Sequence, residues 1–362
     1  MPSTSSALPD PVKAAVLLNN RISQCSYSDI VKHNFTHAIC NAAPGSHVDF
    51  YDPVESTVYP DLKEYDLIVL SGGTASLIDL EPELWVPRML QFVRDVVEHN
   101  LGFRLHFEKK ESSDERWPIK DVDLKMRKKI KLVGVCWGHQ AIAKALGGEI
   151  GMRDDGPLLG VYPVKLSPQG KSFFFPDKSI SSPETINLHK FHKRIVTKPP
   201  TLPVLGKPNT HFLRLSADPA NDIFISPCNN ILSFQGHPEL DETLAKALLT
   251  NSPDYRDRFL ASAKRVEDGV EDVIKSKVED KVEDRVQDKD TQQDLSDSKR
   301  QEDADAVGQK GRSETGEEDS EENTEDDKEK EKEKELDAVS KRMEQGHDGL
   351  DVWRRILAWV RE

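Results

Sequence analysis

Short apolar runs, each ended by a glycine or a polar turn, recur through the first 240 residues of the chain. They cover Lys13–Leu18, Asp66–Leu70, Lys131–Val135 and Asn230–Gln235. Continuous apolar runs of this length between turn signals are typical of strands that are buried on both faces of a parallel sheet. The pattern therefore predicts four central strands.

Helical patterns lie between these strands. Residues 81–93 lead into a helix that would cover one face of the sheet, and residues 140–146 form a second helix that ends at Gly147. Strands that alternate with helices favour an α/β fold with a doubly wound, mostly parallel sheet. Such sheets place their functional residues at the carboxyl ends of the strands.

The C-terminal residues carry a separate helical stripe. Trp353, Ile356, Leu357 and Val360 fall at positions i, i+3, i+4 and i+7. Only two arginines and two acids flank the stripe, so it lacks the basic face of a membrane-binding helix, and no apolar run is long enough to cross a bilayer. We expect this helix to pack on the domain formed by the strands, and we expect no membrane partner.

Charge divides the chain unevenly. Residues 264–340 carry 15 basic and 29 acidic side chains, a net charge of −14 that equals the formal charge of all 362 residues. A stretch with so few apolar residues is expected to be a disordered, solvated spacer, and an acidic tail for a basic protein partner is the alternative. We expect no nucleic-acid partner.

A second charged stretch lies between Asn100 and Lys129, and we expect it to be an exposed insertion. The predicted divisions are a flexible N-terminus, the folded α/β domain, the acidic spacer and the C-terminal helix, at residues 1–12, 13–261, 262–346 and 347–362.

Cys136 occupies the most informative position in the chain. It lies between Gly134 and Gly138, where an apolar strand runs directly into a helix. The glycines permit a tight, strained turn that would expose the sulfur, and a nearby helix N-terminus lowers the pKa of a thiol. A buried, inert cysteine is the alternative, but it would not require the glycines. This pattern predicts a nucleophile elbow.

Two further motifs follow strand ends. Past the strand that ends at Gln235, His237 and Glu239 flank Pro238 and can place an imidazole beside a carboxylate, as a cysteine nucleophile requires. A lone loop histidine would more often be a surface residue. Residues 71–74, Ser-Gly-Gly-Thr, can turn backbone N–H groups toward an oxyanion, although a glycine pair after a strand is often only a turn.

Together, these motifs resemble those of the class I glutamine amidotransferases. Cys136-Trp137-Gly138-His139-Gln140 matches the family's Cys-x-Gly-x-Gln, and His237-Pro238-Glu239 matches its His-Pro-Glu. The resemblance covers most of the first 260 residues and implies the family's flavodoxin-like fold. It also implies that the thiolate of Cys136 attacks a γ-glutamyl carbonyl, His237 transfers protons and Glu239 holds His237. The N–H groups of Gly73 and Trp137 would stabilise the oxyanion, and Gln140 would help to bind the glutamyl group.

Within the family, the chain is similar to stand-alone fungal amidotransferase-like proteins and to plant γ-glutamyl peptidases. Their second motif, often Met-His-x-Asp-x-Val, corresponds here to Phe191-His192-Lys193-Arg194-Ile195-Val196. His192 is either a substrate contact or a structural histidine near the pocket. Arg194 stands where an acid is usual, which changes the charge that a substrate would meet there.

Other features bear on cofactors and location. Cys25, Cys40 and Cys228 lack the spacing of metal ligands, so we expect reduced thiols and no cofactor. The first residues lack the basic start and apolar core of a secretory signal. The chain is therefore predicted to be cytoplasmic. The family resemblance implies a small γ-glutamyl compound as its substrate.

Three functions remain open. One is a self-sufficient γ-glutamyl hydrolase, consistent with the lack of a synthetase half or of an ATP-binding loop after the motifs. Another is a subunit that passes ammonia to a separate enzyme, in a specialised biosynthetic pathway. The third is a non-catalytic protein that uses the acidic spacer to bind partners.

Overall fold

The computed structural model describes residues 10–20, 28–102, 128–176, 182–204, 207–250, 334 and 337–362. Most of the predicted charged insertion between Asn100 and Lys129 and most of the predicted acidic spacer lie outside these residues, as do Cys25 and the first nine residues.

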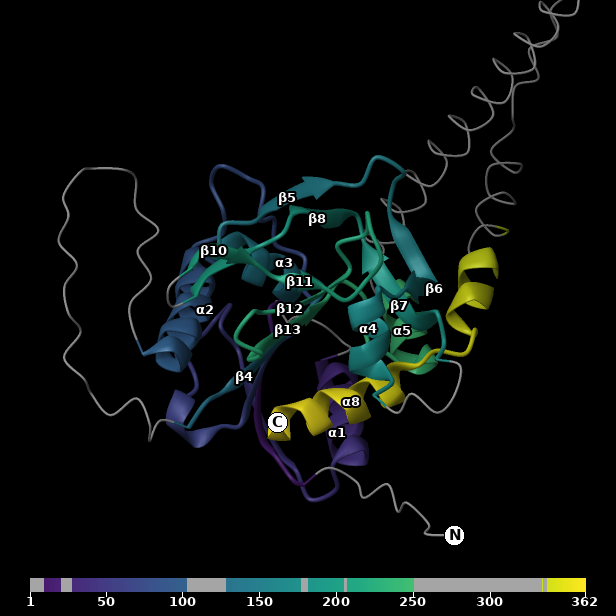
Figure 1. Cartoon of the computed structure of the whole chain (residues 1–362). Helices are drawn as coiled ribbons and strands as arrows, with labels where there is room; N and C mark the ends of the chain where they lie inside the picture. Colours follow the sequence, from purple (N-terminus) through teal and green to yellow (C-terminus); the bar gives the residue numbers. More distant parts are fainter. Residues whose placement is uncertain are drawn as a thin grey trace, which may run out of the picture. The chain divides into compact units, whose positions relative to one another are not determined.

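A seven-stranded sheet forms the centre of the fold (Figure 1). Five neighbouring strands are parallel, and the two strands at one edge are added antiparallel. The strands follow the order β11 (Leu213–Arg214), β12 (Ile223–Ile225), β13 (Ile231–Phe234), β4 (Lys131–Val135), β3 (Leu67–Leu70), β1 (Lys13–Leu17) and β2 (His47–Tyr51). The predicted doubly wound, mostly parallel α/β sheet is confirmed, and each of the four predicted strands is present.

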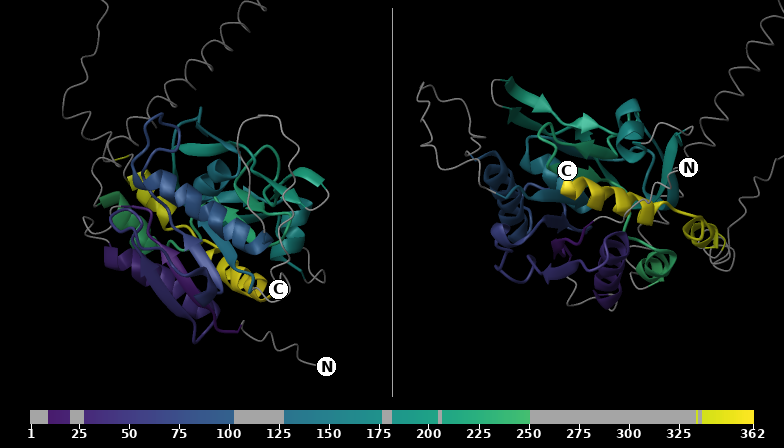
Figure 2. Two further views of the ribbon diagram at one scale, coloured as in Figure 1. Left: turned by 90° about the vertical axis from the view of Figure 1, so that its left-hand side faces the viewer. Right: turned by 60° about the horizontal axis from the view of Figure 1, so that its bottom comes forward.

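Two hydrophobic layers cover the sheet. One contains α1 (Ser28–Ala42) and α8 (Gly349–Arg361), and the other contains α2 (Trp85–Leu101) and α3 (Trp137–Ala145) (Figure 2). Because side chains alternate along a strand, neighbouring residues of one strand belong to different layers. Val69 packs with the α1 and α8 layer, whereas Ile68 packs with the other.

Helix α3 begins at Trp137, three residues before the predicted start at Gln140. Cys136 itself is the N-cap residue, and its carbonyl accepts a hydrogen bond from Gln140 N at 3.1 Å. The turn between strand and helix is therefore as short as one residue. This places the cysteine directly at the first turn of the helix.

The C-terminal helix α8 packs closely on the sheet and on α1. The four apolar residues of its stripe are all buried. Trp353 meets Phe35 of α1 edge to face, and Trp359 donates an indole hydrogen bond to Asn229 at 2.7 Å. Ordered structure also starts earlier than the predicted boundary at residue 347, because residues 337–343 are helical and Met343 is fully buried. Val339 and Met343 lie four residues apart in this stretch, but one such pair among charged residues is too short a pattern to separate the helix from the acidic spacer.

Smaller elements surround the carboxyl edge of the sheet. Strand β7 (Thr185–His192) pairs along its whole length with β6 (Leu158–Lys165), and β8 (Arg194–Lys198) follows directly and pairs with β5 (Glu149–Met152). A bridge between His189 and His237 ties β7 to the segment after β13. The remaining elements are α4 (Pro168–Phe174), β9 (Thr201–Val204), β10 (Lys207–His211), α5 (Glu242–Thr250) and the 3-10 helix η2 (Leu62–Glu64).

None of the helices in the described ranges is both long and apolar enough to cross a membrane.

Candidate active site

Cys136 has the backbone of a nucleophile elbow. Its φ is 51° and its ψ is −101°, a conformation that residues with a side chain rarely adopt. Its N–H donates to Phe234 O of the adjacent strand β13 at 2.7 Å, which holds the turn against the sheet. Strain of this kind persists only where the surrounding structure imposes it, and it is concentrated at functional sites.

The glycines beside the elbow are required by close packing. A Cβ at Gly138 would lie 2.3 Å from Leu70 O, and one at Gly134 would lie 2.5 Å from the side chain of Ile142. Neither contact is sterically possible without movement of the chain. The two glycines therefore allow α3 to begin directly over β3 and β4, and this explains the pattern seen in the sequence.

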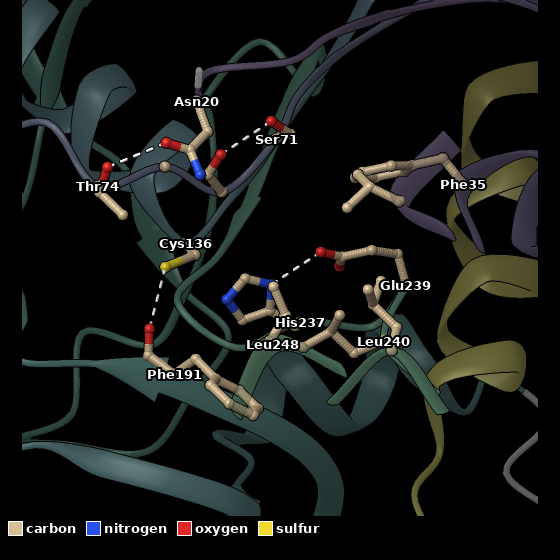
Figure 3. A pocket seen from close by; sticks show the side chains of 14 residues that line it. Asn20, Phe35, Ser71, Thr74, Cys136, Phe191, His237, Glu239, Leu240 and Leu248 are labelled. Atoms are coloured by element: carbon tan, nitrogen blue, oxygen red, sulfur yellow. Dashed lines mark hydrogen bonds and ion pairs between the residues drawn. The ribbon is translucent and has the colours of Figure 1, made fainter. Parts of the chain in front are cut away.

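His237 and Glu239 form a buried pair beside Cys136. Nδ1 of His237 lies 2.8 Å from Oε1 of Glu239, and both side chains are less than a tenth exposed. Figure 3 shows the other imidazole nitrogen on the side that faces the sulfur of Cys136. The register of the sheet explains this proximity, because Phe234, before the histidine turn, is opposite Val135, before the cysteine.

Residues distant in sequence hold the histidine segment in place. Asn34 of α1 donates to Glu239 O at 3.2 Å, and His237 N donates to His189 O at 2.8 Å. The start of α8 lies directly against the same segment, since a Cβ on Gly349 would come within 2.3 Å of Pro238 O. The segment that carries His237 and Glu239 is therefore held by α1, β7 and α8 together.

Charge in the site favours a protonated imidazole. Burial by itself would lower the pKa of His237, but the charges of Glu239 and Cys136 outweigh it and raise this pKa to about 10. Hydrogen bonding from both neighbours acts in the same direction. An imidazolium beside a thiolate is the form in which a cysteine is a nucleophile at neutral pH.

The loop after β3 forms the opposite wall. A Cβ at Gly72 would lie 2.9 Å from Cε1 of His237 and 3.7 Å from Cβ of Cys136, so this glycine is in contact with both. Gly73 lies against Asn19 O, where a Cβ would come within 2.1 Å. Asn19 also donates from its backbone N–H to Ser71 Oγ at 2.9 Å and from its side chain to Ser71 O at 3.0 Å. The loop can therefore bring its backbone close to the sulfur.

A cavity of about 90 Å³ opens at this point (Figure 3). Cys136, His237 and Glu239 border it, together with polar residues of two loops and apolar residues of two helices. The other residues that line it are Asn20, Val31, Phe35, Ser71, Gly72, Gly73, Thr74, Phe191, Leu240, Leu244 and Leu248. Within the described part of the chain, no group of three or more His, Cys, Asp or Glu side chains is placed to hold a metal ion.

Comparison with known proteins agrees with this geometry. Residues 119–252 match the model of the class I glutamine amidotransferase family. The chain is 32% identical over 238 residues to the glutamine amidotransferase-like protein chyE of Penicillium rubens, which covers 66% of this chain and 82% of that protein. The chain belongs to the class I glutamine amidotransferase-like family.

The chain is also similar to a second fungal amidotransferase-like protein and to a plant γ-glutamyl peptidase. The amidotransferase-like protein chry6 of Gibberella zeae is 30% identical over 216 residues, which are 60% of this chain and 71% of that protein. Gamma-glutamyl peptidase 2 of Arabidopsis thaliana is 27% identical over 117 residues, 32% of this chain and 42% of that protein.

The structure of this amidotransferase-like chain brings together Cys136, His237, Glu239 and Gly73, all of which line the cavity. Trp137 adjoins the cysteine in sequence. Its indole is buried against Trp85 and donates to Ala75 O at 2.9 Å.

Gln140 and His192 are not among the residues that line the cavity. The amide nitrogen of Gln140 donates to Arg194 O at 2.9 Å and lies 3.0 Å from the side-chain oxygen of Gln235. His192 is buried, with Nδ1 3.0 Å from Arg194 O, and burial lowers its pKa to about 3. Both side chains therefore hold the backbone of the segment around Arg194.

The guanidinium of Arg194 reaches back to the loop after β3. It donates to Ala75 O at 2.6 Å and to Thr74 O at 2.8 Å. An acid at this position could not make these bonds to carbonyl groups. The arginine is thus a clamp between the start of β8 and the loop that carries Gly73.

Several residues of the site gave no signal in the sequence. Asn34 is one of several polar residues in an amphipathic helix, and Gly349 lies more than a hundred residues beyond the histidine that it supports. The apolar residues of the cavity have the same spacing as ordinary core residues. Only their position in three dimensions distinguishes them.

Proposed function

We propose that the chain is an enzyme that cleaves a γ-glutamyl amide through a γ-glutamyl thioester on Cys136. The observation that carries the proposal is the convergence of a strained cysteine and a buried His237–Glu239 pair on one cavity, at the ends of adjacent strands. The names of the relatives, amidotransferase-like proteins and a γ-glutamyl peptidase, support the same substrate class.

In the first half of the reaction, the thiolate of Cys136 forms a bond to the γ-carbonyl carbon of the substrate. The carbonyl oxygen becomes an oxyanion, and the N–H groups of Gly73 and Trp137 stabilise it. The carbon–nitrogen bond then breaks. The leaving nitrogen takes the proton of His237 and departs as a free amine, or as ammonia if the substrate is glutamine.

In the second half, a water molecule replaces the amine. Because the thioester is neutral, His237 no longer faces the charge of a thiolate, and the balance that raised its pKa is weakened. The imidazole can then accept a proton from water as the water oxygen bonds to the carbonyl carbon. Cleavage of the carbon–sulfur bond releases glutamate and restores the pair of charges.

Glu239 acts by holding the histidine ring. Its carboxylate accepts at Nδ1, which leaves Nε2 as the nitrogen that transfers protons. In this proposal, Gln140 and His192 act behind the glutamyl site, where they fix the segment that carries Arg194.

The test is mass spectrometry of the products formed from glutamine, γ-glutamyl dipeptides and glutathione. The purified protein is compared with Cys136→Ala and with Cys40→Ala and Cys228→Ala, which remove the two other cysteines that the structure describes. We expect release of glutamate that only the change at Cys136 abolishes. Release that survives this change would contradict the proposal.

An ammonia-donating subunit would give a different result. It would cleave none of these substrates alone, yet Cys136 would react with a glutamine-like affinity label. Glutaminase activity would then appear when the partner enzyme is added.

A further inference from the structure

The cavity beside Cys136 has two chemically different ends. Near the sulfur it is bordered by polar groups of the loops that contain Asn20 and Thr74, and by Phe191, whose carbonyl oxygen lies 3.8 Å from the sulfur. Past His237 it is bordered by hydrocarbon side chains from α1 and from the segment that runs into α5. These side chains are Val31, Phe35, Leu240, Leu244 and Leu248. We call this set the apolar wall.

The apolar wall lies on the side of the histidine. Figure 3 shows Phe35 and Leu240 on the far side of the imidazole from Cys136 and Leu248 next to the imidazole, whereas Thr74 and Asn20 lie on the side of Cys136. Phe35, Leu240 and Leu244 are packed in the core, while Val31 and Leu248 are only partly buried. The wall is therefore a fixed surface with an accessible margin.

The chemistry of amide cleavage assigns this side to the leaving group. The leaving nitrogen must receive a proton from His237, so it has to be within hydrogen-bonding distance of the imidazole. Groups attached to that nitrogen then extend past the histidine. The glutamyl half has to extend in another direction from the carbonyl carbon.

The wall offers a leaving group neither charge nor hydrogen bonds. All five of its side chains are hydrocarbon. Glu239, the carboxylate that borders this end, bonds to His237 through Oε1, and its Oε2 is buried. Ammonia, the leaving group of glutamine, would bury none of this surface. An alkyl or aromatic group on the nitrogen would cover it and gain the free energy of apolar burial.

We propose that the preferred substrate is a γ-glutamyl amide whose amine carries an apolar group, aliphatic or aromatic, that packs on the apolar wall. This inference rests on the proposed function. It adds the chemical class of the leaving group, which the reaction alone leaves open.

A series of γ-glutamyl n-alkylamides, from methyl to butyl, tests the inference. The leaving amines have nearly the same basicity, so a trend with chain length measures contact rather than chemistry. We expect kcat/KM to rise by about fourfold for each added methylene group. Glutamine should be the poorest substrate. A flat series, or glutamine as the best substrate, would overturn the inference.

Substitutions connect the trend to the wall. Leu248→Gln and Val31→Gln place polar groups at its accessible margin, and each should flatten the dependence on chain length by about tenfold between methyl and butyl. Leu80→Gln is the matched control, because Leu80 is fully exposed and is not among the residues that line the cavity. If all three variants keep the slope of the unchanged protein, the amine does not contact the wall.

Calorimetry separates this inference from the proposed function. The same amides are titrated into the full-length Cys136→Ala protein, in which turnover is not required. Affinity that rises with chain length, and falls with Leu248→Gln added, supports the wall even if no substrate is cleaved. Cleavage that depends on Cys136 without any trend in either experiment would retain the proposed function and remove the inference.

Discussion

The two sides of the site are built in different ways. The cysteine side is one strand–turn–helix unit held between the neighbouring strands, with Gly138 packed on Leu70 of β3 and the N–H of Cys136 bonded to Phe234 of β13. The histidine side depends on contacts from far along the chain, through Asn34 and Gly349. The proposed nucleophile is therefore positioned by its own turn and the adjacent strands of the sheet, and the proposed base by segments outside the sheet as well. One side can be damaged while the other stays intact.

The largest effect should come from the cysteine side. Cys136→Ala removes the proposed nucleophile, and we expect release of glutamate to fall by about four orders of magnitude or more. The thermal unfolding temperature should not fall, because alanine leaves the packing of the turn nearly unchanged. A variant that is inactive because it is unfolded would contradict this separation of function from stability.

The next largest effect should come from the base. Glu239→Gln keeps the size of the side chain but removes its charge, and we expect a loss of about 10²–10⁴-fold in kcat/KM. Alkylation of Cys136 should continue, although more slowly, because the elbow is built without Glu239. Complete protection from alkylation would mean that the two sides are not independent.

The same variant should change the pH profile. In the proposed mechanism, protonated His237 delivers the proton to the leaving amine, so activity should fall as pH rises through its pKa of about 10. Burial opposes this raised pKa and the charge of Glu239 favours it, so Glu239→Gln should move the alkaline limb to lower pH. Steady-state rates between neutral pH and pH 10.5 would measure the shift. If the alkaline limb of the Glu239→Gln variant does not move, a group other than His237 titrates in that limb.

The stability of the fold should also depend on pH, because the pKa of His237 is raised on folding. A histidine whose pKa is raised on folding stabilises the folded state fully below its unfolded value of 6.5, and this contribution is lost as pH rises through about 10. The free energy of unfolding of the unchanged protein, measured with urea, should therefore fall between pH 6.5 and about pH 10. We expect a smaller loss in Glu239→Gln.

Contact with α8 should have a moderate effect. Gly349→Ala places a methyl group where Pro238 O now lies, and overpacking of this kind costs about 1–3 kcal/mol. Activity should fall more than the rate of alkylation of Cys136, because the histidine segment moves and the elbow does not. Gly346→Ala is the control, since a Cβ there would meet no atom within 4 Å.

The smallest effect should come from the clamp. Arg194→Gln loses at least one of the bonds to the carbonyl groups of Thr74 and Ala75, and we expect KM to rise by a few fold, by about 1 kcal/mol. Arg194→Lys should restore only part of the effect, because an ammonium cannot reproduce the fork of a guanidinium. Equal values for the two variants and the unchanged protein would exclude the clamp.

This contrast also explains what the sequence could predict. The elbow, its glycines and the four central strands depend on neighbours in the chain, so their residues form recognisable motifs. The support of the histidine side depends on which distant segments meet, and a single Asn34 or Gly349 carries no local signature. Gln140 illustrates the same limit, because the motif identified the residue but not the carbonyl group of Arg194 that its amide binds.

The strained backbone of Cys136 sets the stability of the fold against the proposed catalytic role of this residue. Glycine adopts a positive φ without the strain of a side chain, and relief of such strain is typically worth about 1–3 kcal/mol. A library screened for heat resistance alone should therefore enrich Cys136→Gly and lose activity. Directed evolution of this protein has to select for turnover in every round, because relief of strain at the proposed nucleophile would stabilise the fold and remove the activity together.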